Sequence, residues 1–221
     1  MTNQTVSSRD KNKTAKMAIT GMLTAVAFAL QYVEVSIPIV PSFLKLDFSD
    51  IPELIGAFVI GPLYGVIICL IKNLLHLPFG SSAGVGELAN FLMGAVFAFT
   101  AGIIYKHRKT KKIALIACLS GALAMAAASV VLNLVIVYPA YSQMWFGGDM
   151  NKIIGMYKAL LPFSDTLIKS LLIFNLPFTF AKGIIDAIVT MLIYKPLSNM
   201  FVRMNNSLNQ KKSDTKPVSQ N

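Results

Sequence analysis

Four charged side chains stand together between two apolar segments of the chain. Residues 43–53 read Phe-Leu-Lys-Leu-Asp-Phe-Ser-Asp-Ile-Pro-Glu and place Lys45 and three carboxylates among leucines and phenylalanines. Such groups could bind a polar ligand through ion pairs and hydrogen bonds. Charges beside apolar segments of this kind are expensive, and they usually belong to a binding site or to a partner contact. We therefore interpret this loop as a candidate site.

Two further charges, Lys182 and Asp186, lie four residues apart inside the last apolar segment and share one helical face. They could form an ion pair that only neutralises the helix for insertion. Alternatively, Lys182 points into a ligand cavity and Asp186 orients it. Buried intramembrane charges often mark pathways or pockets, so we favour the second interpretation.

Polar residues also recur along an apolar helix expected over residues 85–104. Glu87, Asn90 and Gly94 follow the i, i+3, i+7 spacing and stack on one side, where the glycine would allow a ligand to approach. A ridge of Gly94, Ala98 and Gly102 would equally well serve helix–helix contact.

Single polar residues stand in two other apolar segments. The lone amide of Asn133 could bind a ligand or make an interhelical hydrogen bond, and Lys72 is expected to snorkel towards the membrane surface. In the first segment, Gly21, Ala25 and Ala29 form a stripe of small residues that would suit internal packing or the helix of a partner protein.

Several enzyme classes are excluded by missing residues. Residues 80–84, Gly-Ser-Ser-Ala-Gly, match a nucleophile-elbow pattern, but the only histidines are His76 and His107, and the last apolar segment has none to serve as the base. The sequence contains no Gly-x-x-x-x-Gly-Lys-[Ser/Thr] phosphate loop and no metal-ligand spacing. We therefore expect neither an enzyme nor a bound cofactor or metal.

The composition indicates what positions these residues. Of the 221 residues, 55% are hydrophobic and only 14% charged, and the mean hydropathy is +0.62. Ordinary soluble domains carry about 25% charged residues. The net charge of +10 comes mostly from clusters beside apolar segments rather than from a basic face, so nucleic acid is not an expected partner. The pattern predicts an all-α integral membrane protein in contact with lipid at its basic ends.

The apolar segments predict six transmembrane helices. A disordered basic tail is expected over residues 1–15, a six-helix membrane domain over 16–198 and a polar tail over 199–221. The six spans are expected at about 17–35, 51–60, 62–77, 85–104, 113–138 and 173–195, with an amphipathic helix at about 151–161 in a long loop. An even number of spans with basic termini and a basic 105–112 loop places both termini in the cytoplasm of a cell-membrane protein.

With these motifs in order, the sequence resembles a known family, the riboflavin-specific substrate-binding (S) subunits of energy-coupling factor transporters. The resemblance covers about Met17 to Leu197 and rests on five ordered motifs. They are Phe43-Leu44-Lys45-Leu46-Asp47-Phe48-Ser49-Asp50-Ile51-Pro52, Gly61-Pro62, Lys72-Asn73-Leu74-Leu75, Gly86-Glu87-Leu88-Ala89-Asn90-Phe91-Leu92-Met93-Gly94 and Lys182-Gly183.

The resemblance implies a protein that binds riboflavin as transported ligand near its outer face, together with a transmembrane coupling subunit and two ATPases. It implies that the stripe of small residues on the first helix docks the partner. The implied ligand-binding residues are Lys45, Leu46, Gly94, Asn133 and Lys182, to which we add Asn90 from the same stripe as Gly94, and Phe43, Phe48 and Phe91 could wall the ring system.

Two alternatives stay open. The chain could be an S subunit for another vitamin. It could also be an ion-coupled secondary carrier in which Asp186 or Glu87 titrates.

Overall fold

Apolar, helix-forming stretches fold this chain into a bundle of helices with one small strand pair. The computed structural model describes residues 8–37, 41, 44–80 and 82–210. The helices of the first half are α1 (Ser8–Gln31), α2 (Asp50–Val59), α3 (Pro62–His76) and α4 (Val85–His107). The second half contains α5 (Lys111–Leu132), α6 (Tyr138–Phe146), α7 (Met150–Leu160), α8 (Leu167–Ser170) and α9 (Leu176–Gln210). Strands β1 (Val35–Ser36) and β2 (Lys45–Leu46) pair antiparallel between α1 and α2.

Four helices in the described residues are long and apolar enough to cross a membrane. They cover Lys13–Gln31, Val85–His107, Lys111–Phe146 and Leu167–Tyr194. The predicted second and third spans appear as α2 and α3, of 10 and 15 residues. At about 1.5 Å per residue, both are shorter than a hydrocarbon core of about 30 Å. The predicted break between them is confirmed, because Gly61 takes a φ of 143° and Pro62 begins α3.

Within the described residues, two turns of π-helix interrupt the long helices. The turn η1 (Asn133–Val137) joins α5 to α6, and η2 (Leu171–Asn175) joins α8 to α9. In both places a proline follows two residues after the turn, Pro139 and Pro177. A proline ring clashes with the carbonyl four residues earlier and offers no N–H to it, and a widened turn relieves both problems. The prolines therefore explain why the helices widen there without breaking.

The helices pack through small residues. Gly183 of α9 faces α5 so closely that an added Cβ would lie 2.7 Å from the Cβ of Ala122, and an added Cβ at Gly121 would lie 2.9 Å from Cδ2 of Phe97 in α4. The buried alanines Ala101, Ala117 and Ala122 belong to the same cluster. Such residues let backbones approach within a bilayer, where van der Waals contact rather than water exclusion holds helices together.

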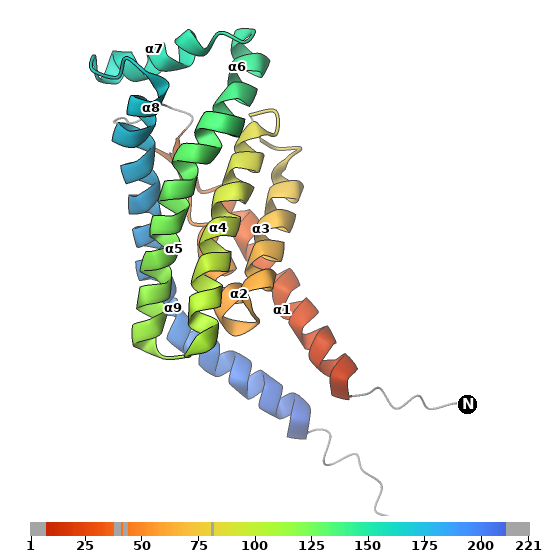
Figure 1. Cartoon of the computed structure of the whole chain (residues 1–221). Helices are drawn as coiled ribbons and strands as arrows, with labels where there is room; N and C mark the ends of the chain where they lie inside the picture. Colours follow the sequence, from red (N-terminus) through yellow and green to blue (C-terminus); the bar gives the residue numbers. More distant parts are fainter. Residues whose placement is uncertain (1–7, 38–40, 42–43, 81, 211–221) are drawn as a thin grey trace, which may run out of the picture.

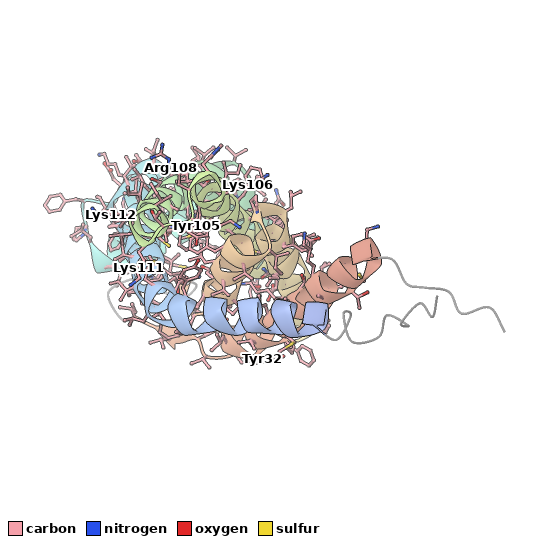
Figure 2. The ribbon with its side chains drawn as sticks, turned by 90° about the horizontal axis from the view of Figure 1, so that it is seen from below. Tyr32, Tyr105, Lys106, Arg108, Lys111 and Lys112 are labelled. Carbon is pink, nitrogen blue, oxygen red and sulfur yellow. The ribbon has the colours of Figure 1, made fainter. Side chains whose placement is uncertain are left out.

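The two ends of the bundle differ in character. In Figure 1 the start of α1, the end of α9 and the α4–α5 turn lie towards the bottom, whereas α6 and α7 lie at the top. Seen from below, Figure 2 shows Lys106, Arg108, Lys111 and Lys112 gathered around this turn. We call this the basic end and the opposite one the α7 end. The amphipathic helix predicted at about 151–161 is confirmed as α7.

The terminal segments are more helical than the sequence predicted. Residues 8–15 were expected in a disordered tail, but α1 begins at Ser8, and residues 1–7 lie outside the described part. Likewise, α9 continues to Gln210, although a polar tail was expected from residue 199, and residues 211–221 are outside the described part. No glycine interrupts either stretch, so a helix that has formed can extend through it.

Candidate functional site

A cavity of about 550 Å³ opens at the α7 end of the bundle. Its walls come from nearly every element: Gln31 ends α1 and Tyr32 follows it, Lys45 comes from β2, Asn90 from α4 and Lys182 from α9. Ile153 and Met156 of α7 also line it. This volume is typical of a pocket for a small organic ligand.

The structure brings five of the six predicted ligand-binding residues to this one cavity. Lys45, Asn90, Gly94, Asn133 and Lys182 all line it. Leu46 is the exception, since it is buried in β2 and is not part of the wall. Residues separated by more than 130 positions in the chain therefore face the same space.

Lys182 is paired differently from the prediction. Its ammonium lies 2.7 Å from Oδ2 of Asp50 and 3.2 Å from Oδ2 of Asp47. Neither carboxylate oxygen of the expected partner, Asp186, has a hydrogen-bond partner among the described residues. Helical side chains lean towards the helix N-terminus, so Lys182 extends away from Asp186 and towards the loop before α2.

Asp50 links this lysine to a second one. Its Oδ1 lies 3.3 Å from the ammonium of Lys72, which also contacts Glu53 Oε1 at 2.6 Å and the hydroxyl of Ser49. Lys72 is fully buried, so the expectation that it snorkels to the membrane surface is wrong. Carboxylates of the predicted loop neutralise it inside the bundle, as a buried charge requires.

Asp47 lies outside the membrane-spanning helices, between β2 and α2. Burial raises the pKa of its carboxyl, but the positive charges of Lys182 and Lys72 and hydrogen bonds from Ser49 outweigh burial and lower the pKa to about 2. The Ser49 N–H donates to Oδ1 at 2.9 Å, and the Ser49 hydroxyl also bonds this oxygen. Asp47 is therefore ionised at neutral pH.

Asn133 and Gly94 occupy contrasting positions in the wall. The Nδ2 of Asn133 is buried and has no hydrogen-bond partner among the described residues, so a donor is available to a ligand. At Gly94, an added Cβ would lie 2.8 Å from both Cys69 Sγ and Glu53 Oε2. This glycine lets α4 approach α2 and α3 closely, which supports the packing role that the sequence left open.

A second polar cluster was not predicted as a site. The carboxylate of Glu87 accepts a hydrogen bond at 2.8 Å from Ser82 and lies 3.0 Å from Nδ1 of His76, and all three line the cavity. Gly80 makes room for it, because a Cβ there would lie 1.8 Å from Glu87 Oε1. Ser82 donates to a carboxylate rather than to an imidazole, so the arrangement does not activate it as a nucleophile.

The aromatic wall also differs from the expectation. Phe43 lies outside the described residues, while Phe48 and Phe91 do not line the cavity. The wall instead contains Tyr32, Phe79, Tyr138, Tyr141, Trp145, Phe146 and Phe178. Tyr32 packs edge-on against His76, with ring centroids 5.1 Å apart. The aromatic residues of the long loop after residue 138 signalled this wall in the sequence, but their position over the cavity depends on tertiary packing.

The small-residue stripe of α1 faces outwards. Gly21, Ala25 and Ala29 are all exposed, and an added Cβ at Gly21 would meet no atom within 4 Å. The stripe is therefore not used for packing within the described part of this chain.

Comparisons with known proteins agree on one family. Residues 15–194 match the family model described as "ECF transporter, substrate-specific component". The chain is 34% identical to riboflavin transporter RibU of Staphylococcus aureus (strain TCH60), over 83% of this chain and 90% of that protein. It is also 34% identical to riboflavin transporter FmnP of Bacillus subtilis (strain 168), over 82% and 91% of the two chains.

A solved structure shares the fold. Its title is "Structure and mechanism of the S component of a bacterial ECF transporter", and it matches with a TM-score of 0.67 and 33% identity. The match covers 86% of this chain and 98% of the other. The family model, the relatives and the shared fold lead to the same conclusion: this chain belongs to the substrate-specific components of ECF transporters.

Proposed function

We propose that this chain is the riboflavin-binding component of an ECF vitamin importer and that its cavity captures riboflavin. The observation that carries this proposal is the convergence of Asn133 and Lys182 on one cavity walled by aromatic rings. The flavin ring edge presents carbonyl oxygens and ring nitrogens. An amide can meet both acceptors and donors there, and an ammonium can donate. The names of the relatives support the same ligand.

The size of the ligand is compatible with tight binding. A ligand of on the order of 30 heavy atoms, at about −0.3 kcal/mol each, reaches roughly −9 kcal/mol. This corresponds to submicromolar affinity. The cavity has room and polar groups for such a ligand, and the aromatic rings offer flat surfaces for its ring system.

Fluorescence titration tests the ligand. The fluorescence of riboflavin should be quenched when it binds the purified, folded protein, and the titration should saturate with a submicromolar Kd. Thiamine, biotin and folate should not compete. Competition by one of these vitamins would instead identify an S component of another specificity. A lack of riboflavin binding by folded protein would contradict the proposal.

We further propose that six helices lie within the cell membrane, four of them crossing it in full and the shorter α2 and α3 lying among them, with the basic end in the cytoplasm, so that the cavity opens outside. The basic residues at the α4–α5 turn support this orientation. Both native cysteines are buried, which leaves little background for labelling. A membrane-impermeant maleimide should label Phe163→Cys in intact cells, but Lys109→Cys only after permeabilisation. The reverse pattern would invert the topology.

We propose that the exposed α1 stripe docks the transmembrane coupling subunit, which works with two ATPases. The exposure of Gly21, Ala25 and Ala29 supports this role, because small residues let a partner helix approach. Riboflavin uptake should then require the coupling subunit and the ATPases. Uptake that persists without them but collapses with a proton uncoupler would favour an ion-coupled carrier.

A further inference from the structure

Three buried polar side chains form a closed ring between α7 and the bundle. The Tyr157 hydroxyl donates to Oδ1 of Asn175 at 2.6 Å, and Nδ2 of Asn175 donates to the Tyr138 hydroxyl, also at 2.6 Å. The two tyrosine hydroxyls bond each other and close the ring. All three side chains are buried, and each comes from a different element: Tyr138 from α6, Tyr157 from α7 and Asn175 from η2.

The ring joins both π-helical turns. Asn175 is the last residue of η2, and Tyr138 directly follows η1. The backbone N–H of Tyr138 donates to the carbonyl of Asn133, the first residue of η1. A single backbone hydrogen bond, from Tyr138 to Asn133, therefore connects the ring to the residue whose side-chain amide faces the cavity. Turns of π-helix are uncommon and often occur at functional sites, so contacts that hold them have a consequence for the site.

The ring also fixes α7 over the cavity. Figure 1 shows α7 lying across the top of the bundle, next to α6 and α8. Only one face of α7 is buried, through Ile153 and Tyr157, and Ile153 lines the cavity together with Met156. A short surface helix held by one face has few contacts to resist local opening. Tyr157 adds to that face a hydrogen bond with a fixed direction.

We propose that Tyr157 and Asn175 are positioning residues for the ligand: they hold α7 across the cavity and fix the π-turn that presents Asn133. Neither residue lines the cavity, so both act through their neighbours. This inference rests on the proposed function, and it assigns the retention of bound riboflavin to a contact between α7 and the two π-turns. Without the ring, α7 opens more often and the amide loses its fixed direction, and both changes speed the departure of the ligand.

The test compares two tyrosine hydroxyls. Tyr157→Phe removes one from the ring. The matched control is Tyr105→Phe, because Tyr105 is also buried and its hydroxyl also bonds another tyrosine, Tyr194, but at the basic end. Riboflavin dissociation is measured by stopped-flow fluorescence, together with the melting temperature of each ligand-free protein. We expect Tyr157→Phe to raise the dissociation rate about tenfold, as the loss of one buried hydrogen bond permits.

The control separates positioning from general stability. Tyr105→Phe should lower the melting temperature by a similar amount and leave the dissociation rate near the wild-type value. If the two variants dissociate equally fast, or if Tyr157→Phe dissociates like the wild type, the inference is wrong. Tyr138→Phe removes another hydroxyl of the ring and should also speed dissociation. An unchanged rate in this variant would likewise contradict the inference.

Hydrogen exchange gives a readout that needs no ligand. In the ligand-free Tyr157→Phe protein, amides of α7 and η1 should exchange faster than in Tyr105→Phe, and amides of α4 should not. Equal exchange in the two variants would overturn the inference. If wild-type protein binds no riboflavin, the proposed function fails, and this exchange comparison still decides whether the ring holds α7 and η1.

Discussion

The ammonium of Lys182 lies 2.7 Å from Oδ2 of Asp50, a contact between α9 and the start of α2. Through its other oxygen, Asp50 also contacts Lys72 of α3. One carboxylate thus ties three helices together at the wall of the cavity, where the Lys182 side chain is 12% exposed. The same contact holds the bundle together and presents a donor to the ligand.

Removing the charge of Asp50 tests this contact. Asp50→Asn should lower the free energy of unfolding by about 3–5 kcal/mol, because it leaves the buried ammonium of Lys72 and the partly buried one of Lys182 with one carboxylate fewer. The change is measured by thermal melting in detergent. Asp165→Asn is the control, since Asp165 pairs with Lys169 on an exposed surface, and it should melt like the wild type. Equal melting of the two variants would show that the Asp50 network does not stabilise the bundle.

Asn133 provides a prediction in which binding and stability separate. Asn133→Ala should weaken riboflavin binding by about 1–3 kcal/mol, because the amide donor would no longer meet the ligand. The ligand-free variant should be as stable as the wild type or more so, since Nδ2 is buried without a hydrogen-bond partner among the described residues. Titration and melting of the same sample measure both effects. A stability loss with unchanged affinity would assign Asn133 to packing.

The lowered pKa of the Asp47 carboxyl predicts how the stability of the fold depends on pH. Its pKa of about 2 in the folded protein lies below the ordinary value of 3.8. A group with a lowered pKa stabilises the fold above its unfolded pKa, so this contribution is present at neutral pH and is lost between about pH 4 and pH 2. The size is about 2 kcal/mol. Melting curves from pH 6 to pH 2 should show this loss, and Asp47→Asn should reduce it. An identical acid profile in the variant would contradict the assignment.

Docking through α1 predicts a defect in transport alone. Ala25→Trp should keep wild-type riboflavin affinity, because Ala25 is exposed on α1 and does not line the cavity. Uptake by cells that also express the coupling subunit and ATPases should be abolished, since a bulky ring prevents close approach of a helix. Phe163→Trp, a change at an exposed residue outside the stripe, serves as the control. Normal uptake by Ala25→Trp would remove the stripe from the docking surface.

Local patterns were sufficient to predict several features of the chain. The apolar stretches, the break at Gly61, the amphipathic α7 and the loop carboxylates each follow from composition and spacing within a few residues. Asn133 and Lys182 stood out for the same reason, because polar groups are rare in such segments.

The partners of the charged residues could not be predicted in this way. Lys182 was matched with Asp186 by spacing along one helix, but its contacts, Asp47 and Asp50, come from the segment that leads into α2, more than 130 residues away. Lys72 looked like a surface lysine because its carboxylates lie on another helix. Pairing across helices depends on tertiary packing, which a periodicity along one helix does not contain. The two π-turns did have a local signal, the prolines two residues beyond them.

The most direct test of the central claim is the structure of this protein with riboflavin bound. The account predicts one flavin in the cavity at the α7 end, with its ring edge within hydrogen-bond distance of Asn133 Nδ2 and the Lys182 ammonium. A flavin bound elsewhere, or one in this cavity that touches neither group, would contradict it.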